Sequence, residues 1–252
     1  MRVFAISDLH LDFDENSAWL REVSASDYVD DALILAGDIS ERLQVIASSF
    51  EWLRARFGAI LFVPGNHDLW LSEEDGFATS FDKLARVQQM AAESGVSMLP
   101  LRSGPLAIVP LLAWYDFSFG VPDATIQRRW MDFRRCRWPD GVHEAEITRR
   151  FLAENRFEPH QSDTVISFSH FVPRIDLMPP GVPPEHRTLY PVLGSTALNE
   201  QIRRLGSQIH VYGHSHINRD LVLDGTRYVN NAFGYPSEGH IAAKSLRCIH
   251  EG

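Results

Sequence analysis

Five short motifs in the sequence gather aspartate, asparagine and histidine, residue types whose side chains bind metal ions. The motifs are Asp8-Leu9-His10, Gly37-Asp38, Gly65-Asn66-His67-Asp68, Ser169-His170 and Gly213-His214-Ser215-His216. Together they offer carboxylate, amide and imidazole groups and no thiolate. Mixed oxygen and nitrogen ligands of this kind suit manganese, iron or zinc better than calcium or a structural zinc site. The motifs therefore predict a metal centre with catalytic chemistry.

The number of these side chains is enough for two metal ions. A dinuclear centre, with ions about 3.5–4 Å apart, needs a carboxylate that can bridge both ions and several further ligands for each. His67 then remains free to transfer a proton to a leaving oxygen, and Asp68 beside it is expected to orient its ring. The seven predicted ligands are Asp8, His10, Asp38, Asn66, His170, His214 and His216.

The elements that precede the motifs explain how they would meet. Each motif follows an apolar run that reads as a strand, and these runs cover residues 3–6, 32–36, 59–63, 164–168 and 208–212. Apolar spacing predicts helices over 16–28, 41–57 and 77–94, with further strands at 106–112, 219–223 and 226–230. In α/β sheets, ligands bind beyond the carboxyl ends of strands, so the five motifs should converge there. Any one motif alone would be read as an ordinary turn or a structural histidine.

Two segments depart from this alternation. Residues 114–141 combine tryptophans with arginines, and we weigh two interpretations of them. They form a cap in which Arg134 and Arg135 bind the substrate, or a helix pair with an apolar face and a solvated arginine face, which is slightly favoured. Residues 173–191 contain six prolines, too many for a helix or a central strand.

Composition limits the classes of function. The chain has 252 residues, of which 44% are hydrophobic, and a net charge of −9. This predicts one globular domain over residues 1–252, and the acidic balance argues against nucleic acid and anionic membranes as partners. No apolar stretch has the length of a signal-peptide core or a membrane span, so a cytoplasmic location is expected. Cys136 and Cys248 are expected to be free thiols, and His210, inside a predicted strand, to be structural.

The order of the five motifs resembles the calcineurin-like metallophosphoesterase superfamily over residues 8–216. The resemblance implies an α/β fold of the mixed type, in which two packed mixed β-sheets are flanked by helices in four layers. By position it implies that Asp8, His10 and His216 bind the first metal. Asn66, His170 and His214 would bind the second, with Asp38 bridging. It also implies that a metal-bridging hydroxide attacks phosphorus in line and that His67 is the general acid.

The predicted function is hydrolysis of a phosphate ester with two metal ions. The intact His67 favours a phosphodiesterase, because a poor alkoxide leaving group benefits from protonation. A phosphomonoesterase or nucleotide pyrophosphatase with the same site is the alternative, and in either case the expected partner is a small-molecule phosphate ester. Non-catalytic scaffolds of this fold tend to have altered metal or acid positions, and the lipid-A-pathway pyrophosphatases typically have arginine where His67 stands. A DNA nuclease is disfavoured by the acidic charge. The oligomeric state is left open.

Overall fold

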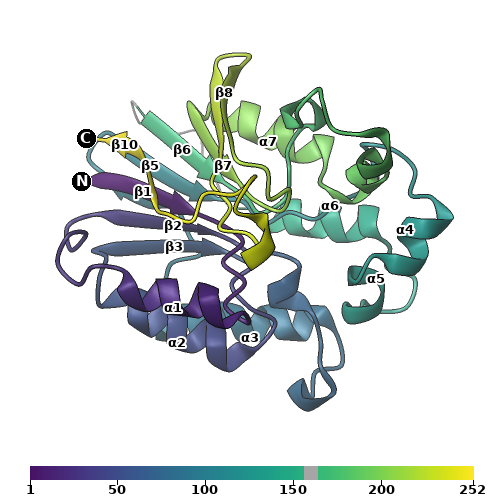
Figure 1. Ribbon diagram of the computed structural model, residues 1–252, viewed down its shortest axis with the longest axis horizontal. Coiled ribbons are helices and arrows are strands. Elements are labelled where there is room, and N and C mark those ends of the chain that lie inside the picture. The colour runs from purple at the N-terminus through teal and green to yellow at the C-terminus, as the bar shows by residue number, and fades with distance from the viewer. Residues whose placement is uncertain (156–163) are drawn as a thin grey trace.

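A computed structural model describes residues 1–155 and 164–252 of the chain, and its strands form two sheets (Figure 1). The first sheet has the order β10-β1-β2-β3, with bounds β1 Arg2–Ile6, β2 Ala32–Ala36, β3 Ala59–Val63 and β10 Arg247–Glu251. The second has the order β4-β5-β6-β7-β9-β8. Its bounds are β4 Leu101–Ser103, β5 Leu106–Pro110, β6 Thr164–Phe168, β7 Ile209–Tyr212, β8 Arg219–Leu223 and β9 Thr226–Asn230.

Both sheets are mixed, as the resemblance implies. Strands β1, β2 and β3 run parallel, and so do β5, β6, β7 and β9. The remaining strands pair antiparallel, with β10 on β1, β4 on β5 and β8 on β9. Strands β2 and β3 are apolar on both faces because both faces of the sheet are covered.

The helices lie outside the two sheets. Their bounds are α1 Asp14–Glu22, α2 Leu43–Arg54, α3 Ser80–Glu93, α4 Ala124–Arg129, α5 Asp132–Arg135, α6 Glu144–Glu154 and α7 Thr196–Leu205. Short 3₁₀ turns are η1 His67–Leu69, η2 Glu73–Asp75, η3 Ile175–Leu177, η4 Pro184–Val192 and η5 Pro236–Glu238. Helices α1, α2 and α3 lie together along the free face of the first sheet (Figure 1).

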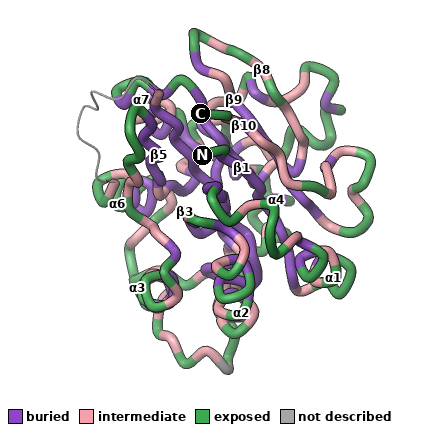
Figure 2. The backbone as a smooth tube through the Cα atoms, turned by 90° about the vertical axis from the view of Figure 1, so that its left-hand side faces the viewer, coloured by how far each residue is buried: buried purple, intermediate pink, exposed green. Residues whose placement is uncertain are grey.

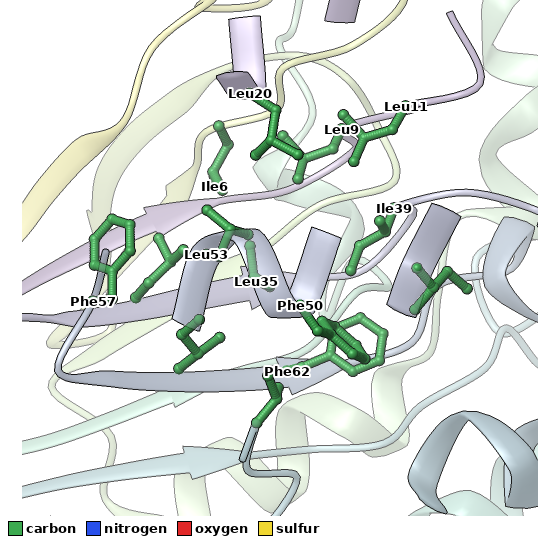
Figure 3. Close-up of a cluster of buried hydrophobic side chains, with 14 of the residues drawn as sticks. Ile6, Leu9, Leu11, Leu20, Leu35, Ile39, Phe50, Leu53, Phe57 and Phe62 are labelled. Atoms are coloured by element: carbon green, nitrogen blue, oxygen red, sulfur yellow. The ribbon is translucent and has the colours of Figure 1, made fainter. Parts of the chain in front are cut away.

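Three buried clusters hold the layers together. Between the sheets, small residues such as Ala5 and Ala36 of the first sheet face Ile108, Phe168 and other apolar residues of the second. On its other face, the first sheet packs larger side chains against the helices, and Phe62 meets Phe50 of α2 with ring centroids 5.1 Å apart (Figure 3). The second sheet packs against α6 and α7 through a third cluster. Figure 2 shows the resulting pattern, with buried strands inside and exposed helix surfaces outside.

The four-layer fold predicted from the sequence is confirmed, while several element bounds differ. The helix expected over residues 16–28 ends at Glu22, because the backbone turns at Val23 and Ser24 accepts hydrogen bonds from the following backbone. Helix α7 is absent from the prediction although it has a clear signal. Leu198, Ile202 and Leu205 are buried at helical spacing between a Ser195 cap and Gly206, which has a φ of 70°.

The short edge strands β4 and β10 were not expected either, because exposed polar residues interrupt their apolar pattern. The 173–191 segment contains 3₁₀ turns and no strand, consistent with its prolines. Within the described residues, no helix is both long and apolar enough to cross a membrane.

Candidate metal centre

The five predicted motifs meet at the carboxyl ends of strands from both sheets. Asp8 and His10 follow β1, Asp38 follows β2 and Asn66 follows β3, while His170 follows β6 and the two histidines of the last motif follow β7. The sheets are joined at this point by backbone hydrogen bonds, since Ser7 donates to the Asn231 carbonyl at 3.1 Å and accepts from the Phe233 amide at 2.8 Å. The centre therefore lies where the two sheets come together.

Four of the side chains form a first group. Asp8, His10, Asp38 and His216 each direct one ligand atom into a space in which all such atoms lie within 4.8 Å of one another. The Nε2 atoms of His10 and His216 are 3.1 Å apart, and His216 Nε2 lies 3.3 Å from Asp8 Oδ1.

The second group shares Asp38 with the first. His170 Nε2 lies 3.4 Å from Asp38 Oδ2 and 3.1 Å from His214 Nδ1. The amide oxygen Oδ1 of Asn66 is 3.1 Å from the same His170 nitrogen. The ligand atoms thus form two groups with Asp38 common to both, and the amide oxygen of Asn66 lies beside the second.

These spacings fit two metal ions. Two donor atoms that bind the same metal ion, each at about 2.0–2.2 Å, lie roughly 3–4.3 Å from one another, depending on the angle between the two metal–ligand bonds. The distances of 3.1–3.4 Å between donor atoms fall in this range. Buried imidazole nitrogens facing one another and carboxylate oxygens are also the donor set that a divalent ion would satisfy.

The backbone at the centre is held in an unusual conformation. Seven non-glycine residues in the described part of the chain have positive φ, and five of them are Asp8 (54°), His10 (43°), Asp38 (56°), His214 (66°) and His216 (54°). Such left-handed conformations cost free energy and cluster at functional sites. Here they turn the chain sharply after β1, β2 and β7, so that residues directly beyond these strands face the centre.

Two glycines allow the loops to approach closely. A Cβ atom on Gly65 would lie 2.1 Å from Asp38 Oδ1, and one on Gly37 would lie 2.5 Å from His170 Nδ1. Gly37 also has a φ of 85°. A side chain at either position would displace a predicted ligand.

Three histidines are oriented from outside the centre. A ring nitrogen that faces a carbonyl must donate, so His170 Nδ1 donates to the Ala36 carbonyl at 2.9 Å and His214 Nε2 donates to the Val192 carbonyl at 3.0 Å. His216 Nδ1 lies 2.6 Å from Glu238 Oε2. In each ring the other nitrogen faces the centre, the arrangement typical of metal-binding histidines.

Sequence reasoning missed Glu238. It lies 22 residues beyond His216 in a turn, and no periodic pattern marks it. Two asparagines that precede Glu238 in the chain also support the loop that carries the last motif. Asn230 Nδ2 donates to the Gly213 carbonyl at 3.2 Å, and Asn231 Nδ2 donates to the Ala5 carbonyl at 3.0 Å, which ties the last motif to β1.

The structure corrects the prediction that Asp68 orients the His67 ring. Its carboxylate accepts four backbone N–H bonds of 2.8–3.1 Å, from Gly65, Asp38, Ile39 and Ser40. Asp68 is buried and holds the loop after β2 against the loop after β3. One buried carboxylate therefore satisfies four backbone N–H donors of the two adjacent loops.

His67 is surrounded by aromatic rings. Trp70 stacks on it with centroids 3.6 Å apart, and Tyr235 Oη lies 3.4 Å from its Nε2 atom. The His67 side chain is 14% exposed, so it borders the centre at the solvent side. Tyr235 also stacks on His10 with ring centroids 4.4 Å apart, and no sequence pattern indicates the contacts of Trp70 and Tyr235 with these histidines.

Electrostatics divide the histidines into two kinds. Burial lowers the pKa of His214 to about 3 and that of His10 well below its usual range. Burial also acts on His170 and His216, but the nearby carboxylates outweigh it. Asp38 and Asp8 raise the pKa of His170 to about 9, and Asp8 and Glu238 raise that of His216 to about 10.

Residues 114–141, here called the Arg/Trp segment, border the centre on one side. Arg135 lies with its guanidinium 5.4 Å from the Trp70 ring and its Nη2 2.7 Å from Glu41 Oε2, while Arg134 is exposed on α5. Both line a cavity of about 490 Å³ together with Arg137. Trp114 and Trp138 pack in the cluster beside α6, although both lie outside the helices α4 and α5 of the segment.

Two further sequence predictions concern His210 and the two cysteines. His210 is buried in β7 and contacts the hydroxyls of Ser167 and Ser169 at 2.7 and 3.1 Å, away from the predicted ligands, so it is structural. Cys136 and Cys248 are free thiols.

Comparison with known proteins shows the family to which the chain belongs. The family model described as calcineurin-like phosphoesterase matches residues 1–218. A curated relative, the [acyl-carrier-protein] phosphodiesterase PptH of Mycobacterium tuberculosis, is 30% identical over 267 aligned positions, which cover 94% of this chain and 78% of the relative.

Solved structures agree with the sequence comparison. The crystal structure of phosphopantetheinyl hydrolase (PptH) from Mycobacterium tuberculosis is similar to this chain with a TM-score of 0.82 and 28% identity. The match covers 98% of this chain and 95% of that one. The two chains therefore share the fold over nearly their whole lengths.

Proposed function

The chain belongs to the calcineurin-like phosphoesterase family, and from this premise we propose that it hydrolyses the phosphodiester that joins phosphopantetheine to an acyl carrier protein. It is a metal-dependent phosphoesterase. The proposal narrows the substrate to a diester attached to a protein, in place of the free small molecule expected from the sequence.

One observation carries the proposal. Asp38 belongs to both groups of ligand atoms, and His67 Nε2 lies 4.0 Å from its Oδ2 atom. A candidate proton donor therefore stands directly beside the candidate two-metal centre, which is the arrangement that cleavage of a diester with a poor leaving group needs.

We propose that Asp8, His10, Asp38 and His216 hold one ion and that Asp38, Asn66, His170 and His214 hold the other. Manganese, iron and zinc suit these ligands. When bound, the two ions would lower the pKa of water and neutralise negative charge on the phosphoryl group. His67 would give a proton to the departing oxygen, with Trp70 fixing the plane of its ring.

The substrate class follows from the relative. PptH acts, by its name, on an acyl carrier protein, and it matches 94% of this chain. We propose that Arg134 and Arg135 contact anionic groups of the substrate from the cavity they share with Arg137. Arg135 is paired with the carboxylate of Glu41, whereas the exposed Arg134 donates only to the Arg128 carbonyl among the described residues and so keeps its charge available for this role.

The proposal is tested with purified chain and a phosphopantetheinylated acyl carrier protein. Intact-mass spectrometry should show the loss of one phosphopantetheine, dependent on added manganese, iron or zinc and absent in Asp38→Ala. The arginines are tested by Arg134→Ala with Arg135→Ala, which should raise KM more than it lowers kcat. Arg149→Ala is the matched control, because Arg149 is exposed on α6 and pairs only locally with Glu146.

Two model substrates distinguish the alternatives. Turnover of bis-p-nitrophenyl phosphate without release from the carrier protein would indicate another diester as the substrate. Faster turnover of p-nitrophenyl phosphate than of the diester would instead favour the monoesterase.

A further inference from the structure

A buried carboxylate from the Arg/Trp segment reaches the candidate metal centre. Asp132, at the start of α5, is 2% exposed although it lies in a segment rich in exposed arginines. Three N–H donors meet it. Asn66 Nδ2 donates to Oδ1 at 2.8 Å, Trp70 Nε1 donates to Oδ1 at 2.6 Å, and Trp130 Nε1 donates to Oδ2 at 2.7 Å.

Each of these donors belongs to a side chain that touches the centre. Asn66 presents its amide oxygen 3.1 Å from His170 Nε2. Trp70 stacks on His67 with centroids 3.6 Å apart, and the Trp130 ring meets the His214 ring edge-on at 5.8 Å. One carboxylate therefore contacts three groups that border a predicted metal ligand or the predicted proton donor.

The hydrogen bond to Asn66 determines which end of its amide faces the centre. A carboxylate accepts and does not donate when ionised, so the atom of Asn66 nearest Asp132 must be the NH₂ group. The amide oxygen is then directed at His170 and the second group of ligand atoms. Without Asp132, the amide could rotate and present N–H groups, which cannot bind a metal ion.

We infer that Asp132 is a positioning residue, which holds the Asn66 oxygen toward the second metal ion and the Trp70 ring against His67. This inference rests on the proposed two-metal function. It also gives the Arg/Trp segment a defined task, because the segment carries a residue that the centre depends on as well as the arginines at its rim.

A purely structural role is the competing explanation. Asp132 could serve only to attach the Arg/Trp segment to the rest of the fold. The two roles differ in what a substitution does to metal binding, because loosening the segment alone should lower stability and leave the affinity of the ions unchanged.

The test compares three variants of the full chain. Asp132→Ala removes both acceptor oxygens. Asp132→Asn can keep an oxygen at the Oδ1 position for Asn66 and Trp70 while its amide nitrogen faces Trp130. Asp123→Ala is the control for loosening, because Asp123 caps α4 of the same segment through the amides of Thr125 and Ile126 and is exposed. Affinity for manganese or zinc is measured by competition with a chromogenic chelator, together with Tm and kcat on bis-p-nitrophenyl phosphate.

We expect Asp132→Ala to bind the second ion, the one beside Asn66, about 10–100-fold less tightly and to lower kcat more than it raises KM. Asp132→Asn should recover most of the affinity, and Asp123→Ala should lower Tm alone. In the Asn66→Ala background, Asp132→Ala should lower metal affinity little further, because both substitutions act through the contact between Asn66 and Asp132.

The inference fails if Asp132→Ala keeps the wild-type affinity for both ions, or if Asp132→Asn is as impaired as Asp132→Ala. It also fails if the two losses of metal affinity add fully in the double variant. Metal affinity is measured without substrate, so these outcomes stay separate from failure of the carrier-protein proposal.

Discussion

Asp38 contacts His67 through both of its carboxylate oxygens. Oδ1 accepts a hydrogen bond from the His67 backbone amide at 2.9 Å, and Oδ2 lies 4.0 Å from the Nε2 atom of its ring. The residue common to both groups of predicted ligands therefore also fixes the chain that carries the predicted proton donor. If the proposed roles hold, a substitution of Asp38 should therefore disturb both metal binding and the position of His67.

Replacement of His67 by asparagine should separate proton transfer from metal binding. We expect kcat on a diester with an alkyl leaving group to fall by about 10²–10⁴, because such a group leaves as a strong base without a proton. The fall with p-nitrophenyl esters, whose leaving group needs no proton, should be much smaller. Metal content should stay at the wild-type value, and an equal loss on both kinds of ester would contradict the role of His67.

Replacement of Asp38 by alanine should remove both ions. Each ion would lose a ligand and the two would lose their bridge, so elemental analysis should find little metal, with no measurable turnover. Asp224→Ala is a matched control, because Asp224 is also an aspartate with positive φ (51°) but is exposed on the β8–β9 turn. It removes the same side chain from a residue with a similar φ, 51° against 56°. Full metal content in Asp38→Ala would overturn the proposed centre.

The contact of Glu238 with His216 should support one ion only. Glu238→Ala removes the oxygen 2.6 Å from His216 Nδ1, which leaves the ring free to turn. Loss of such an outer partner typically costs about 10–100-fold in metal affinity. Chelator competition should show this loss for one of the two ions. Equal weakening of both would show that Glu238 acts on the fold of the loop instead.

Metal binding should release protons at neutral pH. In the metal-free chain the pKa of His170 is about 9 and that of His216 about 10, so both rings carry a second proton and a positive charge at pH 7. A metal ion binds only neutral imidazole, so the extra protons must leave, and metal affinity should rise with pH until about pH 10, the pKa of His216. His10 and His214, whose pKa values are lowered, should release none. Calorimetry in two buffers of different ionisation enthalpy measures the release, and a value near zero would contradict the prediction.

The sequence determined the parts of the centre that lie next to strands. Strands such as β2 and β3 have the bounds expected from their apolar runs, and the motifs follow them directly. Because parallel strands end at one edge, sequence order alone was enough to predict that Asp8, Asp38 and Asn66 converge. The family was recognised from the order of the five motifs, and that resemblance implied the four-layer fold.

Only the tertiary structure decided which residues support these side chains. Asp132 and Glu238 come from a short helix and a turn that have no apolar period, and their partners Asn66 and His216 lie 66 and 22 residues away. Asp68 lies beside His67 in the chain, yet its side chain turns to the backbone of the neighbouring loop. Sequence patterns report which residues face a core or follow a strand, whereas the direction of a polar side chain in a loop depends on donors that only the folded chain brings within reach.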